Sequence, residues 1–312
     1  MKDLKIVFMG TPDFATHCLK HLIVKEYNVV GVITAPDRPS GRGQKVNISS
    51  VKKYALEQEI EVLQPSNLKD PDFISQLQEW KPDVQVVVAF RMLPKEVWQL
   101  SSKGTFNLHA SLLPKYRGAA PINWAIINGE KESGVTTFFI DEKIDTGNII
   151  FQEKIKIEKA ENAGSLHDKL MDIGSQLITK TIDAIKQQNA PSIKQEGDTT
   201  QAPKIFKADC KIDWQNNGKT ILQKILGLSP YPSAWTNLMG DPNKVFKIYD
   251  ASIEFTNHNL KIGDVELDKT QFKVAVKDGF ICLKEVQISG KKRMKIDEFL
   301  RGFQQKENCF VQ

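Results

Sequence analysis

Three apolar runs, each long enough for one buried strand, constrain the fold most strongly. They are Leu4–Met9, Asn28–Thr34 and Val84–Phe90, and stretches with helical periodicity separate them. Strands that are apolar on both faces are typical of parallel sheets, because helices cover both sides of such a sheet. The pattern therefore predicts an α/β fold with a doubly wound, mostly parallel, Rossmann-like sheet.

The C-terminal third has a different pattern of short alternating strands between glycine turns, which is typical of a small OB-like β-barrel. The predicted strands are Val245–Ile248, Ala251–Phe255, Phe272–Val276, Gly279–Leu283 and Glu285–Ile288. A polar segment with two prolines, residues 189–206, precedes this part and resembles a linker. We therefore expect a catalytic domain at 1–188, a linker at 189–206 and a C-terminal barrel domain at 207–312.

The turn after the first predicted strand argues against a dinucleotide cofactor. It reads Met9-Gly10-Thr11-Pro12 and has one glycine, whereas a nicotinamide or flavin dinucleotide site would require G-x-G-x-x-G. We expect Thr11 to cap the following helix, with Pro12 at its first position.

Composition excludes several other classes of protein. No apolar run approaches the ~20 residues of a membrane-spanning helix, and the N-terminus runs directly into a strand pattern without a signal peptide. We therefore expect a cytoplasmic protein with no membrane partner. The four cysteines are scattered without a C-x-x-C pair, so we expect free thiols and no metal site. The net charge of +5, concentrated in the C-terminal third, allows a polyanionic partner.

The stretch Gly104–Pro121 contains the strongest candidates for chemistry. It begins as a strand and becomes a loop at Ala110, and Asn107 and His109 lie two residues apart, so both side chains leave the same face. An amide can donate to a developing oxyanion, and an imidazole can take or give a proton near neutral pH. On these residues alone, the pair is either catalytic or the polar end of a half-buried strand.

Three polar loops follow predicted strands. Residues 35–47 form a long cationic loop around Arg42, for which we favour phosphate contacts over an ordinary surface role. A second loop begins at Arg91, and a third spans Asp141–Gly147. Because α/β sheets bind ligands at the carboxyl ends of their strands, we expect a site where these loops meet.

Several motifs together resemble the folate-dependent formyltransferase superfamily. The core motifs are Asn107-x-His109, Ser111-Leu112-Leu113-Pro114, Arg117-Gly118 and Asp145-Thr146-Gly147. The resemblance runs nearly end to end and includes Ser40–Lys45, Leu228–Trp235 and Phe299–Gly302. It is closest to the members that formylate methionyl initiator tRNA, because of the basic loop and the extra C-terminal domain.

The resemblance implies a reaction and a set of site residues. The formyl donor would be 10-formyltetrahydrofolate, the acceptor would be initiator methionyl-tRNA, and no metal and no more than a monomer is needed. The implied catalytic residues are Asn107, His109 and Asp145. The implied folate-binding residues are Ser111, Leu112, Leu113, Pro114, Phe90, Arg91, Met92, Leu93 and Asp141. The implied tRNA-binding residues are Arg42, Lys45, Lys291, Lys292 and Arg293.

One departure and two alternatives accompany this resemblance. Phe90-Arg91 stands where many relatives have Tyr-Gly, which adds a large cation beside the expected folate site.

A formyltransferase that acts on a sugar-nucleotide amine or on glycinamide ribonucleotide is the nearest alternative, and the basic stretch Lys291–Arg293 argues against the latter. A nucleic-acid-binding module with an idle α/β domain is disfavoured by the intact catalytic trio. The sequence leaves open whether His109 acts as a base or as an oxyanion donor.

Overall fold

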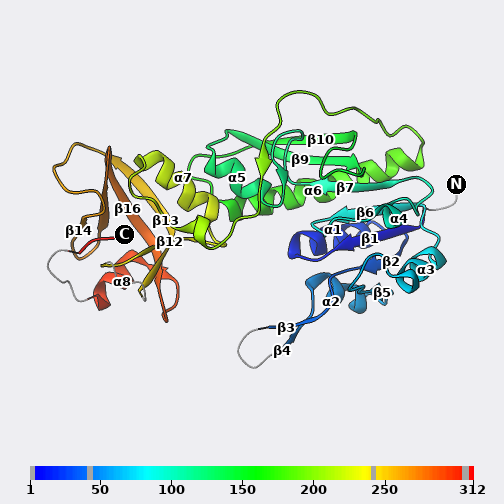
Figure 1. The fold of residues 1–312 in the computed structure, drawn as a ribbon, viewed down its shortest axis with the longest axis horizontal. Coiled ribbons are helices and arrows are strands. Elements are labelled where there is room, and N and C mark those ends of the chain that lie inside the picture. Colours follow the sequence, from blue (N-terminus) through cyan, green and yellow to red (C-terminus); the bar gives the residue numbers. More distant parts are fainter. Residues whose placement is uncertain (1–3, 41–44, 240–243, 304–308) are drawn as a thin grey trace. The chain divides into compact units, whose positions relative to one another are not determined.

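The computed structural model describes residues 4–40, 45–239, 244–303 and 309–312 (Figure 1). The chain divides into two compact units. The first unit comprises Met1–Gly118, Glu132–Lys156 and His167–Ala202, and the second comprises Ala119–Lys131, Ile157–Leu166 and Pro203–Gln312.

A seven-stranded sheet forms the centre of the first unit. Its strands, in spatial order, are β10 (Ile149–Lys156), β9 (Glu132–Phe139), β7 (Thr105–His109), β6 (Val84–Val88), β1 (Ile6–Gly10), β2 (Val29–Ile33) and β5 (Val62–Leu63). The five strands from β7 to β5 run parallel, whereas β9 and β10 add an antiparallel edge. The predicted mostly parallel α/β sheet is therefore confirmed. The strand order reverses direction between β1 and β6, which is where open α/β sheets leave a crevice at their carboxyl edge.

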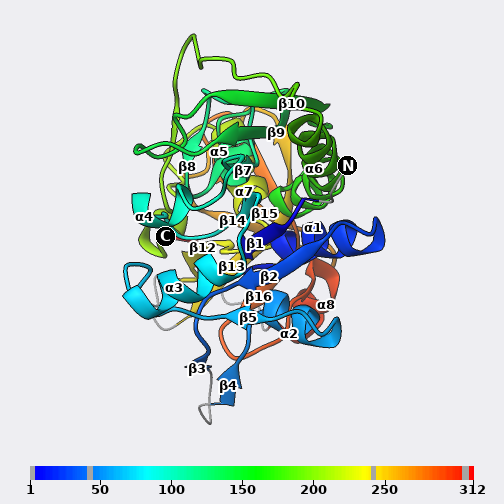
Figure 2. The same cartoon turned by 90° about the vertical axis from the view of Figure 1, so that its right-hand side faces the viewer.

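Helices cover both faces of this sheet, as Figure 2 shows. They are α1 (Asp13–Val24), α2 (Ser50–Glu57), α3 (Pro71–Glu79), α4 (Lys95–Trp98) and α6 (Ala163–Lys186). Val7 and Met9 of β1 pack into a buried cluster with Phe73 of α3 and Val97 of α4. On the opposite face, α1 and α6 lie side by side, where the Phe14 and His167 rings meet at 5.3 Å.

The expected cap of α1 was wrong. The helix begins at Asp13, and its N-cap residue is Pro12 rather than Thr11. Pro12 has an extended backbone, with ψ of 177°, so it cannot occupy the first helical position.

The second unit is built on an antiparallel sheet. Its elements are α5 (Pro121–Ile127), α7 (Gly218–Leu228), β12 (Ala234–Asn237), β13 (Val245–Phe255), β14 (Val265–Leu267), β15 (Phe272–Val276), β16 (Gly279–Ile288), β17 (Met294–Lys295) and α8 (Ile296–Gly302). The sheet order is β12-β13-β16-β15-β14, with β17 on β16, and Phe246, Phe272 and Phe299 pack in its core. The predicted strands Val245–Ile248 and Ala251–Phe255 form one continuous strand, β13. Likewise, Gly279–Leu283 and Glu285–Ile288 together form β16. The register shifts around Asp250 mark the break that the sequence pattern suggested in β13.

The C-terminal residues connect the two edges of this sheet. Asn237 at the β12 edge exchanges two backbone hydrogen bonds with Gln312, at 2.9 and 3.0 Å. Val311 donates to the oxygen of Gly263 at 2.9 Å, and Val265 of β14 donates to the oxygen of Cys309 at 3.1 Å. One short segment therefore bonds to both edge strands and closes the sheet into a small barrel.

Candidate active site

Asn107 and His109 lie at the carboxyl end of β7, a strand that is paired on both sides. Asn107 is opposite Val87 of β6 and Phe138 of β9. The two residues are separated by Leu108, whose side chain is buried on the opposite face against α6. The regular pairing of β7 therefore places the amide and the imidazole on one face, as the spacing predicts.

The imidazole of His109 is 6% exposed and is held by the loop that follows it. Its Nε2 lies 2.8 Å from the backbone oxygen of Tyr116. Because a carbonyl oxygen only accepts hydrogen bonds, Nε2 carries a hydrogen and donates it. The other ring nitrogen, Nδ1, lies 3.8 Å from Oδ2 of Asp145. The structure therefore brings His109 and Asp145 together, although they are distant in sequence.

Asp145 stands in a strained part of its loop. Its φ of 54° lies in the left-handed region, which costs a residue with a side chain on the order of 1–3 kcal/mol. Its Oδ2 accepts a hydrogen bond from the Gly118 nitrogen at 2.8 Å. At Gly147, a Cβ would lie 1.6 Å from the backbone oxygen of Phe139, so the loop requires glycine there. The close approach of the backbone explains the glycine of the Asp-Thr-Gly sequence that follows β9.

Asn107 retains unused hydrogen-bonding capacity. Its side-chain Oδ1 is buried and has no hydrogen-bond partner among the described residues. Buried polar groups are nearly always paired, so an unpaired one on the face that also carries His109 is suited to a bound ligand. An unpaired buried acceptor at this position fits a ligand-binding side chain better than the simple polar end of a strand.

The predicted folate loop Ser111–Pro114 is fixed by two side chains that the sequence did not single out. Thr136 of β9 donates to the Ser111 oxygen at 2.6 Å and accepts from the Leu113 nitrogen at 3.2 Å. Gln152 of β10 donates to the Leu113 oxygen at 2.8 Å. Leu113 is buried, whereas Leu112 and Pro114 are half-buried. The antiparallel edge of the sheet therefore sets the shape of this loop.

The loop after β6 holds the departure noted in the sequence. The Arg91 guanidinium donates to the backbone oxygen of Ser66 at 2.9 Å and to that of Pro65, and it lies 5.5 Å from the Phe90 ring. Burial, and to a lesser extent the charge of Arg38, lower the pKa of Arg91. Arg91 therefore ties its loop to the segment after β5. Met92 is exposed and Leu93 buried in the same loop.

Asp141 lies at the exposed start of the third loop. Its carboxylate accepts hydrogen bonds from the Thr146 hydroxyl at 2.8 and 2.9 Å and from the Lys143 nitrogen at 3.0 Å. Asp141 therefore closes the loop that carries Asp145. Sequence motifs alone did not reveal this role of Asp141.

The predicted basic loop is a hairpin of β3 (Arg38–Ser40) and β4 (Lys45–Asn47), which extends away from the sheet of the first unit in Figure 1. Arg42 lies outside the described residues, and for Lys45 the structure describes the backbone. The base of the hairpin is anchored by Asp37. Its carboxylate pairs with Lys52 and accepts from Gln64 at 2.8 Å, and these hydrogen bonds hold the pKa of Asp37 below its usual value.

The other predicted tRNA-binding residues belong to the second unit. Lys291 and Lys292 are exposed between β16 and β17. Arg293 pairs with Glu285 at 2.5 Å and lies 4.3 Å from the ring of Tyr249. The hydrogen bond to Glu285 raises the pKa of Arg293. All three side chains are exposed, and Arg293 is the one that is engaged by an ion pair and a ring.

The sequence analysis missed Gln195, which lies in the predicted linker. Its Oε1 accepts from two nitrogens of Arg117, and its Nε2 donates to the backbone oxygens of Asp145 and Gly147. A single glutamine in a polar segment matches no motif, so no signal in the sequence points to it. It nevertheless joins the loop that carries Asp145 to Arg117, in the loop that follows His109.

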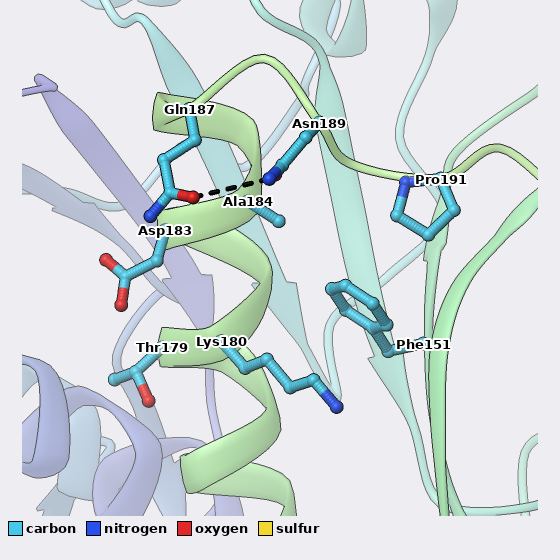
Figure 3. Close-up of a pocket in the computed structure, with 8 residues that line it drawn as sticks. All are labelled: Phe151, Thr179, Lys180, Asp183, Ala184, Gln187, Asn189 and Pro191. Atoms are coloured by element: carbon cyan, nitrogen blue, oxygen red, sulfur yellow. Dashed lines mark hydrogen bonds between the residues drawn. The ribbon is translucent and has the colours of Figure 1, made fainter.

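A surface hollow of about 710 Å³ lies elsewhere on the first unit (Figure 3). Phe151 of β10, Lys180 and Asp183 of α6, and Pro191 are among its lining residues, and the Lys180 ammonium lies 4.7 Å from the Phe151 ring. None of the predicted catalytic or folate-binding residues lines this hollow. Within the described ranges, no group of three or more His, Cys, Asp or Glu side chains is arranged to hold a metal ion.

Comparisons with known proteins show to which family the chain is related. Residues 4–182 match the family described as formyl transferase, and residues 204–304 match the formyl transferase C-terminal domain. The chain is 52% identical over 310 residues to methionyl-tRNA formyltransferase of Bacteroides thetaiotaomicron, which covers 97% of this chain and 96% of the relative. It is 52% identical over 305 residues to methionyl-tRNA formyltransferase of Flavobacterium johnsoniae, which covers 97% of each.

Two solved structures share the fold at low identity. HypX from Aquifex aeolicus in complex with tetrahydrofolic acid has a TM-score of 0.66 at 17% identity, and the match covers 99% of this chain and 51% of HypX. WlaRD, a sugar 3N-formyl transferase in the presence of dTDP and 5-N-formyl-THF, has a TM-score of 0.64 at 23% identity. The match covers 94% of this chain and 100% of WlaRD.

Proposed function

The chain belongs to the formyl transferase family, and we propose that it transfers the formyl group of 10-formyltetrahydrofolate to the α-amino group of initiator methionyl-tRNA, giving N-formylmethionyl-tRNA for translation initiation. The observation that carries this function is identity of about half the residues, over nearly the full length of both chains, to relatives named methionyl-tRNA formyltransferase. The arrangement of Asn107, His109 and Asp145 at one end of β7 supplies the chemistry for an acyl transfer.

The first unit offers a site for the folate donor. The donor supplies an activated formyl group, and the residues proposed to hold it are those of the loop after β6 and of Ser111–Pro114. Two observations fit such a ligand: the buried oxygen of Asn107 and the buried Nε of Arg91 are unpaired among the described residues. The loop Ser111–Pro114 is fixed from β9 and β10, so it is preorganised for binding.

Asn107 is proposed to stabilise the transition state. Attack of the amine on the formyl carbon places negative charge on the formyl oxygen, and a side-chain amide held on a strand can donate a hydrogen bond there. The strand pairing of β7 on both sides holds this donor in place. Removal of one such donor costs about 2.7–4 kcal/mol of transition-state stabilisation in other enzymes.

His109 is proposed to act as the general base through Nδ1. Since Nε2 donates its hydrogen to Tyr116, neutral His109 presents a lone pair at Nδ1. Nδ1 therefore accepts the proton that the amine loses, and the imidazolium that forms lies 3.8 Å from the Asp145 carboxylate, which stabilises it. The protonated ring can then return the proton to the departing folate nitrogen, so the enzyme ends unchanged. The neutral ring has no free N–H, so His109 could donate to an oxyanion only after Nδ1 has accepted this proton.

The tRNA is proposed to contact both units. Lys45 begins β4 in the first unit, and Arg42 lies between β3 and β4 in the sequence. Lys291, Lys292 and Arg293 belong to the second unit. The exposure of Lys291 and Lys292 supports a role in phosphate contacts. We assign catalysis to residues 1–188 and tRNA binding mainly to residues 207–312, with 189–206 between them.

The protein is proposed to act as a monomer in the cytoplasm. All three residues of the catalytic trio come from one unit of one chain, so the site needs no second copy. Its tRNA acceptor places the reaction where translation takes place. No helix in the described parts of the chain is long and apolar enough to cross a membrane.

Acceptor choice tests this function. Purified protein is incubated with 10-formyltetrahydrofolate and one of three acceptors: methionyl initiator tRNA, the same tRNA without methionine, or a sugar-nucleotide amine. We expect formylation of the methionyl-tRNA and of neither control. Formylation of the sugar amine, with the tRNA unmodified, would preserve the acyl-transfer chemistry and contradict the proposed acceptor.

A further inference from the structure

The side chain of Gln195 joins two loops of the active site through both ends of its amide. Its Oε1 accepts from Nε of Arg117 at 3.2 Å and from a terminal nitrogen of the same guanidinium at 2.7 Å. Its Nε2 donates to the backbone oxygens of Asp145 at 2.9 Å and Gly147 at 2.8 Å. A glutamine amide offers two hydrogens and one oxygen with two lone pairs, so these four bonds use its full capacity.

The position of the Asp145 carboxylate depends on this loop. Asp145 has a φ of 54°, a conformation that persists where surrounding contacts enforce it. The two bonds from Gln195 hold the peptide oxygens on either side of Thr146. The carboxylate itself accepts from the Gly118 nitrogen and lies 3.8 Å from Nδ1 of His109. A shift of this backbone therefore changes the distance between carboxylate and imidazole.

The same segment also holds the backbone partner of His109. Thr200 accepts the Tyr116 N–H on its hydroxyl at 2.8 Å and the Arg117 N–H on its backbone oxygen at 3.0 Å. Just beyond it, β11 (Gln201–Ala202) pairs in parallel with β8 (Arg117–Gly118). The Tyr116 oxygen is the atom that receives the Nε2 hydrogen of His109. Gln195 and Thr200 thus contact the supports of both catalytic side chains.

We propose that Gln195 is a positioning residue for formyl transfer, whose amide sets the separation between the Asp145 carboxylate and His109. The inference rests on the proposed function. The amide has one workable orientation, because its oxygen faces a guanidinium and its nitrogen faces two carbonyl oxygens. A carboxylate at this position would pair with Arg117 but would place an oxygen against the two carbonyl oxygens.

The test is Gln195→Glu, with Glu196→Gln as the matched control. Glu196 is the exposed next residue, so the control makes the reverse exchange of amide and carboxylate at an adjacent position. For each protein, kcat, both KM values and the pH profile of kcat are measured in formylation of methionyl-tRNA. Gln195→Glu is expected to lower kcat at least tenfold, to change each KM less than threefold, and to shift the acidic limb of the profile. Glu196→Gln is expected to match the wild type.

Two results would overturn the proposal. One is a wild-type kcat and pH profile in Gln195→Glu. The other is a loss of activity that merely parallels a loss of folded protein in thermal unfolding, since that would make Gln195 a structural residue alone. If Gln195→Glu does not fold, Gln195→Met replaces it in the test, because methionine has a side chain of similar length and no charge. The proposal then requires the same fall in kcat at unchanged KM.

The wild-type protein separates this proposal from the function on which it rests. If the wild type leaves methionyl-tRNA unmodified, the proposed function is contradicted. The ratio of variant to wild-type kcat is then measured on the amine that the wild type does formylate. A ratio near one with that amine contradicts the role of Gln195, and a ratio below one tenth supports it.

Discussion

Nδ1 of His109 lies 3.8 Å from Oδ2 of Asp145, while the other ring nitrogen donates a hydrogen bond to a backbone oxygen. This distance is too long for a hydrogen bond but short enough for a strong electrostatic interaction when the ring is protonated. The carboxylate is itself held by the Gly118 N–H. In the proposed mechanism, Nδ1 takes up the proton and Asp145 stabilises the resulting charge.

Replacement of Asp145 by asparagine tests this division of roles. The amide of Asp145→Asn keeps an oxygen for the Gly118 N–H but removes the negative charge, so the imidazolium loses its partner. We expect kcat to fall at least tenfold, within the range of acid–base effects, while the protein stays folded. Steady-state kinetics check the result, with Glu142→Gln as control because Glu142 is an exposed acid of the same loop. Equal kcat in Asp145→Asn and wild type would contradict the role of the charge.

Replacement of Arg42 by alanine tests the proposed tRNA contact of the basic hairpin. We expect a higher KM for methionyl-tRNA and an unchanged affinity for the folate donor. Because each neutralised phosphate releases counterions, the slope of log affinity against log salt should fall by about one. Filter binding over a range of salt concentrations measures that slope. Lys25→Ala, at the exposed end of α1, is the control. A matching loss of folate affinity in Arg42→Ala would contradict the assignment.

A Cβ at Gly147 should disturb the loop of Asp145. The added atom would lie 1.6 Å from the Phe139 oxygen, so the backbone must move. We therefore expect Gly147→Ala to reduce kcat at least tenfold and to lower the melting temperature. Gly302→Ala is the control, since a Cβ there meets no described atom within 4 Å. Wild-type activity in Gly147→Ala would show that the position of this loop does not limit catalysis.

Closure of the barrel by the C-terminal residues has a pH signature. Burial raises the pKa of the Cys309 thiol from 9.0 to about 11. Between these values the unfolded chain has lost this proton and the folded chain keeps it, so the free energy of unfolding falls as pH rises from 9 to 11. Urea unfolding across this range measures the fall.

The variant Cys309→Ala isolates this contribution from other groups that titrate at high pH. Its free energy of unfolding should decline less steeply than that of the wild type between pH 9 and 11. Identical slopes for the two proteins would contradict a buried thiol in the closing segment.

The sequence predicted the parts of the fold that depend on local pattern. The apolar run at Val84–Phe90 predicts β6 because a strand buried on both faces has little room for polar side chains. The pattern at 245–255 predicts two strands because Asp250 interrupts the alternation, and a register shift absorbs that interruption in the structure. The closing segment Cys309–Gln312 was not predicted, since its partners at Asn237 and Gly263 are distant in sequence.

The same distinction holds for the site. Asn107 and His109 could be singled out from the sequence because their spacing of two on a strand is a local signal. Asp145 came from the resemblance, because its proximity to His109 depends on the turn after β9. Gln195 carries no such signal. Its role follows from four hydrogen bonds to loops about 50 and 78 positions away, which no local pattern records.

The most direct test of the account is single-turnover formyl transfer to methionyl initiator tRNA, measured side by side for wild type, Asn107→Ala and His109→Ala. The wild type should form N-formylmethionyl-tRNA, and each variant should do so at least about a hundredfold more slowly while it still binds the folate donor, in line with the loss of an oxyanion donor or a general base. A wild type that leaves the tRNA unmodified, or two variants that react at the wild-type rate, would contradict the account.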